Sequence, residues 1–228
     1  MQATVLRLVK VPLQCKALDD LLDGGIESGC VTLFFGEAGS GKTNICLQLA
    51  RNVARDEKKV IYIDTEGLSM ERLRQICGDD FETVVKRILI SEPYTIDDQE
   101  KMVEKTLKLV EKNKDIGIVI LDSATTHFRV TLRNEEREDR RLLTRQVTML
   151  VQMAREMGLP VVLTSQVYTD IETGEYMPLG GHMLTHNAKA LVRLEKTGPG
   201  LRKAVIIKHR HIEERKEAAF RLTANGVE

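Results

Sequence analysis

The chain reads Gly36-Glu37-Ala38-Gly39-Ser40-Gly41-Lys42-Thr43 between an apolar run, Val31–Phe35, and a helix-like stretch, Ile45–Ala54. A strand, a glycine-rich turn and a helix start in this order form a cradle for phosphate. The glycines let backbone N–H groups converge on an anion, and the helix N-terminus adds its positive end. Lys42 is placed to reach the β- and γ-phosphates, and the Thr43 hydroxyl to bind Mg²⁺. The stretch, with Asn44 beside it, predicts a nucleoside triphosphate site.

Length and composition favour one soluble globular domain. The chain has 228 residues, of which 42% are hydrophobic. Lys and Arg number 34, as do Asp and Glu, so the net charge is zero and no global field favours nucleic acid. The four cysteines form no C-x-x-C pair, and no apolar run reaches the ~18 residues of a membrane span. We expect a cytoplasmic protein with reduced thiols and no membrane contact.

Apolar runs alternate with helical patterns along most of the chain. Runs continuous in Val, Ile and Leu indicate strands buried on both faces, and strand–helix alternation indicates right-handed crossovers and a parallel sheet. The predicted strands are Val31–Phe35, Val60–Asp64, Ile88–Ile90, Ile116–Asp122 and Val161–Ser165. The predicted helices are Thr43–Arg55, Met70–Cys77, Asp97–Asn113 and Arg140–Met157.

The pattern changes after Gln166. Residues 169–181 are rich in polar residues and glycine and are expected to form a loop. Three further strands are predicted to add antiparallel to one edge of the sheet, namely Ala190–Leu194, Lys203–Lys208 and Ala218–Leu222. The predicted fold class is therefore α/β, a mostly parallel twisted sheet flanked by helices, with antiparallel C-terminal edge strands.

Two carboxylates follow predicted strands. Asp122 ends the strand that begins at Ile116. In phosphate-binding enzymes of this kind such an aspartate sits at the carboxyl end of the strand next to the cradle strand and holds Mg²⁺. Glu66 stands just beyond the strand Val60–Asp64, where a carboxylate can orient and deprotonate the water that attacks the γ-phosphorus. Each also has a structural interpretation, as a cap of the helix that follows.

The order of the motifs resembles the RecA-type recombinases of the archaeal and eukaryotic branch. The segment 15–29 precedes the cradle, and after it come Asp64-Thr-Glu-Gly67, Leu121-Asp122-Ser123, Leu163-Thr-Ser-Gln-Val167 and Leu179-Gly-Gly-His182. The resemblance covers nearly the whole chain. Two departures set it apart from the full-length recombinases: it starts at the ATPase core, without an N-terminal helix-hairpin-helix domain, and it has Ile207-Lys208-His209-Arg210 in place of an Asp-Ser-Pro segment.

This resemblance implies a single RecA-like P-loop ATPase domain over residues 1–228, with ATP and Mg²⁺ as cofactors. It implies that Glu66 is the catalytic carboxylate and that Gln166 is a sensor linking the γ-phosphate to DNA. Arg72 resembles an arginine that stacks on adenine, although its spacing from Glu66 is one residue shorter than in the family. The structural alternative for Gln166 is an exposed glutamine at a strand end.

Lys208 and Arg210 resemble the K-x-R finger pair of bacterial RecA-fold ATPases, including the DnaB and KaiC types. Such cations reach the γ-phosphate of a neighbouring subunit and stabilise the charge of the transition state only after assembly. The alternative is a basic edge strand that resists aggregation.

The family binds DNA through two loops, which fall here at about 125–141 and 168–181. The first mixes five arginines with four acidic residues, which suits either phosphate contacts or ion pairs on a solvated helix. The second has three acidic residues, no Lys or Arg, and two tyrosines for stacking: Asp170, Glu172, Glu175, Tyr168 and Tyr176. Because acidic side chains repel a polyanion, we expect weaker DNA binding than in a full recombinase, unless the basic segment after Ala188 compensates.

We therefore expect a weak, DNA-dependent ATPase of homologous recombination and DNA repair. It would bind single- or double-stranded DNA and assist or regulate the main recombinase. One alternative is an ATP-switched mediator that performs no strand exchange itself, which the acidic second loop favours. Another is a KaiC-like signalling ATPase, which Lys208 and Arg210 suggest. Self-assembly and a nucleoid-associated location are implied by the same resemblance.

Overall fold

The computed structural model, which describes residues 9–128, 135–171 and 174–228, is built around a nine-stranded sheet of order β13-β12-β11-β10-β3-β7-β6-β4-β5. Its strands are β3 (Val31–Gly36), β4 (Lys59–Asp64), β5 (Ile88–Ser91), β6 (Ile116–Asp122), β7 (Val161–Ser165), β10 (Ala190–Lys196), β11 (Leu201–Lys208), β12 (Glu217–Thr223) and β13 (Gly226–Val227). Within this order, each pair of neighbouring strands between β10 and β5 is parallel. The predicted α/β fold with a mostly parallel sheet is confirmed.

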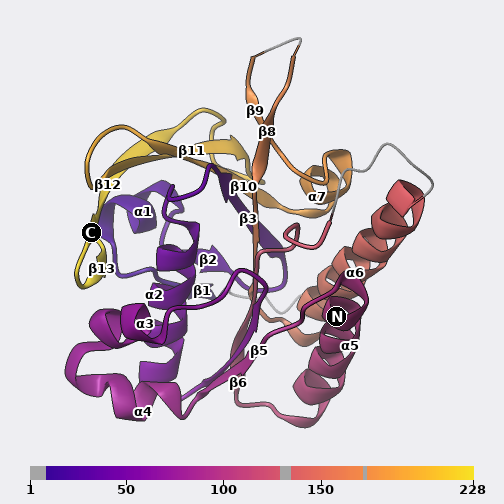
Figure 1. Cartoon of the computed structure of the whole chain (residues 1–228). Helices are drawn as coiled ribbons and strands as arrows, with labels where there is room; N and C mark the ends of the chain where they lie inside the picture. The colour runs from indigo at the N-terminus through magenta and orange to yellow at the C-terminus, as the bar shows by residue number, and fades with distance from the viewer. Residues whose placement is uncertain (1–8, 129–134, 172–173) are drawn as a thin grey trace, which may run out of the picture.

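Helices cover both faces of the sheet (Figure 1). On one face lie α1 (Lys16–Leu21), α2 (Lys42–Arg55), α3 (Met70–Cys77), the 3-10 turn Gly78–Asp80 and α4 (Phe81–Val85), and on the other α5 (Ile96–Lys112) and α6 (Glu135–Met157). Alternate strand residues feed two separate cores. Phe34 and Tyr62 pack on the α2 side, and Leu33 and Ile63 on the side of α5 and α6. Because both faces are covered there, the central strands β3, β4, β6 and β7 are mostly apolar.

The C-terminal part departs from the prediction in two ways. The strand β10, which follows α7 (His182–Asn187), pairs in parallel with β3, so the antiparallel edge begins only at β11. The predicted loop 169–181 instead holds most of a hairpin, formed by β8 (Val167–Thr169) and β9 (Tyr176–Pro178), which projects beyond the sheet (Figure 1). These strands are short and largely exposed, so they carry no burial pattern from which a strand could be predicted.

A small antiparallel pair lies before the cradle strand, formed by β1 (Lys10–Val11) and β2 (Ile26–Glu27). Gly25 between them has a φ of 122°, and a side chain there would overlap the backbone of Val11 and Pro12. The pair therefore depends on glycine at this position. Within the described ranges, no helix combines the length and the apolar character that a membrane crossing requires.

Strand order decides which residues meet at the carboxyl edge of the sheet. In an open parallel sheet, ligands bind in the crevice at this edge. Here β7 lies between β3 and β6. The prediction that Asp122 ends the strand next to the cradle strand is therefore wrong: its strand, β6, is second from β3, and β7 lies between the two strands.

Candidate functional site

The cradle occupies the turn from β3 into α2. Gly39 and Gly41 have φ angles of 72° and 107°, which residues with a side chain rarely adopt. A side chain at Gly36 would overlap the Leu194 carbonyl oxygen, and one at Gly41 would lie 3.2 Å from Leu222. Leu194 on β10 and Leu222 on β12 thus pack against the loop, where the space suits glycine and not a larger residue.

Lys42 is buried at the floor of the cradle, with 5% of its surface exposed. Its Nζ donates to the carbonyl oxygens of Gly36 at 2.8 Å and Glu37 at 3.1 Å. Burial lowers the pKa of Lys42, and the negative charges of Glu66 and Asp122 oppose that shift. The hydroxyl of Ser40 is buried and has no hydrogen-bond partner among the described residues. A buried ammonium group and an unpartnered donor in one loop fit a phosphate group.

A pocket of about 130 Å³ opens over the cradle. Residues between Ala38 and Asn44 line it, together with Glu66 from the end of β4 and Gln166 from the end of β7. Gln166 Nε2 donates to Glu66 Oε1 at 3.0 Å. Lys42, Glu66 and Gln166, which were predicted to bind phosphate, to activate water and to sense the γ-phosphate, therefore line one pocket. Its volume is below the ~300 Å³ of whole-ligand sites, so it matches a phosphate chain and not an entire nucleotide.

Asp122 is buried beside Thr43, which is the pair predicted to hold Mg²⁺. Its Oδ1 accepts a hydrogen bond from Thr164 Oγ1 at 2.5 Å, and its Oδ2 from the Tyr62 hydroxyl at 2.8 Å. Burial raises the pKa of Asp122, while hydrogen bonds from Thr164, Tyr62 and Thr43 act in the opposite direction. Hydroxyl and carboxylate oxygens are the ligand types that Mg²⁺ prefers, so these residues fit the ion.

The turn that carries Glu66 is fixed by Asp64, a residue that the sequence analysis did not single out. Asp64 Oδ1 accepts from the backbone N–H groups of Glu66 and Gly67 at 3.1 Å each, and Oδ2 accepts from that of Leu68. Tyr62 and Thr164, which hold Asp122, were missed as well. The available signal was polarity inside otherwise apolar strands, since a buried polar group needs a partner.

Arg72 joins α3 to its neighbours beside the cradle. Its Nε donates to Asn44 Oδ1 at 2.7 Å, and its Nη atoms donate to the carbonyl oxygens of Thr223 at 2.7 Å and Ala224 at 2.9 Å. These bonds fix the guanidinium next to a residue of the cradle. Stacking on adenine stays a prediction.

Lys208 and Arg210 are engaged within their own chain, away from the pocket over the cradle. Lys208 Nζ donates to the carbonyl oxygens of Thr185 at 2.8 Å and Ala188 at 3.0 Å, which lie at the end of α7. Such a cation satisfies terminal carbonyls and complements the helix dipole. Arg210 Nη2 donates to Glu27 Oε2 at 2.5 Å. Action on a neighbouring subunit stays a prediction for both.

The two segments predicted to face DNA meet at a hollow of about 680 Å³. Phe128 and Arg140 line it from the first segment, Tyr168 and Leu179 from the second, and His182 from the start of α7. Parts of both segments, including Arg129, Arg133 and Glu172, lie outside the described residues. The rings of His182 and His186 stack with centroids 5.3 Å apart beside this hollow, which His182 lines.

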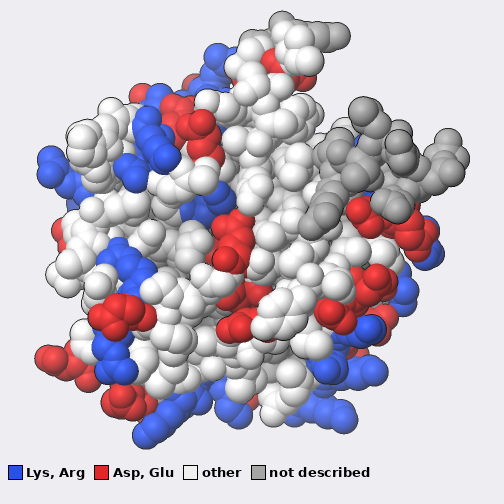
Figure 2. Space-filling model, viewed as in Figure 1, with Lys and Arg blue, Asp and Glu red and all other residues white. Residues whose placement is uncertain are grey.

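The basic C-terminal segment makes mostly local contacts. Arg193 and Lys203 pair with Glu195 at 2.8 and 3.2 Å, and Arg202 Nε donates to the Gly39 carbonyl oxygen at 2.9 Å. Figure 2 shows Lys and Arg interspersed with Asp and Glu around the rim of the visible face, with uncharged residues over most of its middle. The described residues on this face form no continuous basic stripe for a phosphate backbone.

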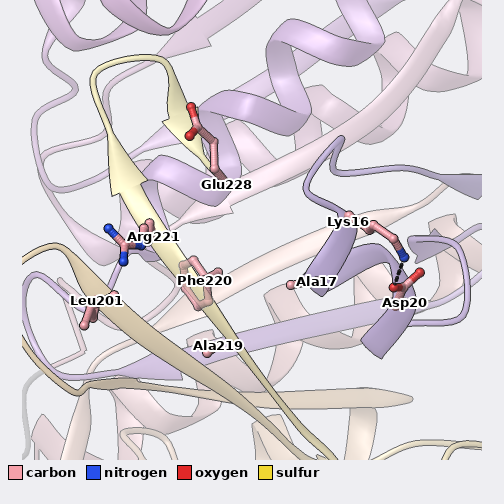
Figure 3. A pocket seen from close by; sticks show the side chains of 8 residues that line it. All are labelled: Lys16, Ala17, Asp20, Leu201, Ala219, Phe220, Arg221 and Glu228. Carbon is pink, nitrogen blue, oxygen red and sulfur yellow. Dashed lines mark hydrogen bonds and ion pairs between the residues drawn. The ribbon is translucent and has the colours of Figure 1, made fainter.

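A second hollow, of about 630 Å³, lies between α1 and β12 (Figure 3). Ala17 and Phe220 contribute to its apolar lining, and the Lys16–Asp20 ion pair lies at its margin. The Phe220 ring would be 3.6 Å from a side chain added at Gly41. This hollow therefore lies behind the cradle and contains none of the predicted site residues.

The sheet order and the position of the cradle define the class of protein, a RecA-like α/β core. The family model described as Rad51 matches residues 5–228, and the chain belongs to this family. The RecA-type resemblance is thereby confirmed.

The similar proteins are RadB proteins of archaea. The chain is 46% identical over 215 residues to the DNA repair and recombination protein RadB of Methanococcoides burtonii, covering 93% of this chain and 95% of that relative. It is 41% identical over 220 residues to that of Archaeoglobus fulgidus, covering 96% and 97%. A solved structure described as the RadB recombinase superimposes with a TM-score of 0.80 at 32% identity, covering 95% of this chain and 98% of that one.

The buried Asp122 carboxylate predicts a pH-dependent gain in stability for Asp122→Asn. Because burial raises its pKa above about 3.9, ionisation costs stability, and this cost appears only as the pH rises through the folded-state pKa. The neighbouring hydroxyls of Tyr62 and Thr164 can donate or accept, so they can still pair with an amide. Nucleotide-free Asp122→Asn should be more stable than wild type near pH 8 in urea unfolding, and the difference should shrink as the pH falls through the raised pKa of Asp122.

Asp115 provides a matched control of opposite sign. It is exposed, and a hydrogen bond from Lys59 lowers its pKa. Asp115→Asn should therefore show no gain at high pH. A lower stability of Asp122→Asn than of wild type near neutral pH would contradict the assignment of an energetically costly carboxylate.

Proposed function

We propose that the chain binds ATP with Mg²⁺ at the cradle, hydrolyses it slowly, and acts on DNA in homologous recombination and repair. The names of its RadB relatives support the biological role. The hydrogen bond between Gln166 and Glu66, in the pocket that also contains Lys42, supports a γ-phosphate-sensing ATPase. A role in assisting or regulating a full-length recombinase is part of the proposal.

The residues of the pocket suit attack of water on the γ-phosphorus. Lys42 and the backbone N–H groups of the cradle would hold the phosphates, and Thr43 and Asp122 would hold the metal. Mg²⁺, when bound, neutralises phosphate charge. Glu66 would orient the attacking water and accept its proton, while the bond to the bridging oxygen breaks and ADP leaves. Gln166 fixes the Glu66 carboxylate through the 3.0 Å hydrogen bond.

The β8–β9 hairpin provides a physical route from phosphate to DNA. It touches the site at both ends: Gln166 directly precedes β8 and binds Glu66, and Tyr176 on β9 donates to Glu37 Oε1 of the cradle at 3.0 Å. A change in phosphate occupancy that moves either acceptor would move the hairpin. Tyr168, which is 43% exposed, and the adjoining hollow offer a surface on which bases can stack.

The charge of the hairpin favours a second candidate function, that of an ATP-switched mediator. Asp170 and Glu175 are its described charged residues, and the sequence between them adds only Glu172. An acidic hairpin opposes tight binding of single strands, whereas a mediator needs only nucleotide-dependent contact with a partner recombinase. On this alternative ATP would control a protein interface and not strand exchange.

Replacing Lys42 by alanine tests the site assignment. The change removes the one cation at the cradle floor, so ATP turnover should fall by about 100-fold or more, the cost of losing a preorganised charged contact. Lys105→Ala, on the exposed face of α5, is the matched control and should retain wild-type turnover. Nucleotide binding by fluorescence and phosphate release would both be measured, and unchanged values for Lys42→Ala would overturn the assignment.

Mixing two inactive variants tests whether the finger acts across subunits. Lys42→Ala lacks a working cradle but keeps the finger, and Arg210→Gln lacks the finger but keeps the cradle. In an equal mixture, up to about a quarter of the interfaces should join an intact cradle to an intact finger and recover activity. Mixing Lys42→Ala with Glu66→Gln, both defective in the cradle, should recover nothing. Absence of recovery in the first mixture, with both proteins folded and assembled, would reject action in trans.

A strand-exchange assay separates the two candidate functions. The purified chain with ATP should show little exchange alone but should raise the rate of a full-length recombinase from the same organism. Lys42→Ala supplies the control without nucleotide function. Robust exchange by the chain alone would reject the mediator, and failure to bind single-stranded DNA at low salt would favour a signalling ATPase instead.

A further inference from the structure

A buried carboxylate on β2 is only half satisfied. Glu27 is 3% exposed, and its Oε2 accepts the hydrogen bond from Arg210. Its Oε1 is buried without a hydrogen-bond partner among the described residues. The Arg210 guanidinium, 2.5 Å from Oε2, is the cation paired with this carboxylate. An ionised buried oxygen without a donor is energetically costly.

Two imidazoles from the turn after β11 lie beside this carboxylate. The ligand atoms of Glu27, His209 and His211 all lie within 4.8 Å of one another. His211 Nδ1 is 3.5 Å from Glu27 Oε1, which is close to the ~3.4 Å between ligand atoms of a tetrahedral ion with bonds of about 2.1 Å. The two rings are perpendicular, with centroids 4.6 Å apart, so they do not stack face to face.

The charged groups around these ligand atoms have opposite effects on a bound cation: Asp23 favours it, and Arg210 and Lys10 do not. Asp23 Oδ2 lies 3.8 Å from His211 Nε2, on the far side of the ring from Glu27, as in a carboxylate–histidine–metal arrangement. Arg210 opposes the ion, and Lys10, which pairs with Asp23 at 2.8 Å, partly neutralises that carboxylate.

We propose that Glu27, His209 and His211 bind a divalent transition-metal ion, with Zn²⁺ as the expected species. Imidazole together with one carboxylate suits Zn²⁺ and not Mg²⁺. The His211 side chain is 43% exposed, so solvent can supply a fourth ligand. Cys30 Sγ lies 3.7 Å from Glu27 Oε2 but is not among the atoms that all lie within 4.8 Å of one another. The ion would supply Glu27 Oε1 with the partner that it lacks.

Zn²⁺ titration of the full chain tests this site. Metal-free protein, in excess Mg²⁺ to occupy oxygen-rich sites, should bind one Zn²⁺ in competition with a chromophoric chelator. His211→Ala should weaken binding by more than about 100-fold, and Asp23→Asn by about tenfold, the ranges for loss of a ligand and of an outer partner. Zn²⁺ should raise the thermal midpoint of wild type but not of His211→Ala.

The stacked pair on α7 supplies the matched control. His182 and His186 are spaced i,i+4 and could themselves chelate Zn²⁺, so the double variant His182→Ala/His186→Ala should retain full affinity if the proposal is right. Equal affinity of wild type and His209→Ala/His211→Ala would overturn it, as would loss of binding in the α7 variant. Should His211→Ala fail to fold, Co²⁺ absorption by wild type decides: a tetrahedral spectrum supports the site, and an octahedral spectrum rejects it.

Discussion

The buried charge of Lys42 is the constraint on which the rest of the site depends. An ammonium group taken out of water is costly unless hydrogen bonds and opposite charges replace the lost solvation. Here the carbonyl oxygens of Gly36 and Glu37 accept its protons, and Glu66 and Asp122 supply the charge. These four groups lie at or just after the ends of β3, β4 and β6. The ends of these strands must therefore already be together in the sheet before any ligand binds.

The cost of burying Lys42 also explains why β10 and β12 pack against the cradle loop. The loop can turn its carbonyls toward Lys42 only because glycine at 39 and 41 accepts positive φ, and β10 and β12 hold the turn from behind. The antiparallel edge therefore supports the cradle and is not an appendage to the sheet. Arg202 on β11 extends this support, since it donates to the carbonyl oxygen of Gly39.

The sequence predicted the parts of the site that depend on local chemistry and missed those that depend on strand order. Val31–Thr43 predicted strand, loop and helix correctly because glycine spacing and apolar runs are local signals. Nothing local indicates that β7 inserts between β3 and β6, or that β10 runs parallel to β3. The same limit hid Tyr62 and Thr164, whose roles arise from Asp122 on a neighbouring strand.

The position of Arg210 constrains how a finger could work. Withdrawing it from Glu27 would leave a carboxylate that is 3% exposed without its cation, which costs free energy because the buried charge loses its hydrogen-bonded partner. Binding of Arg210 to the phosphate of a neighbouring subunit must offset this cost, or another cation must replace Arg210 beside Glu27. An ion bound at Oε1 would do so, because its charge both satisfies Glu27 and repels Arg210. Metal binding at Glu27 and release of Arg210 would then be thermodynamically linked, each favouring the other.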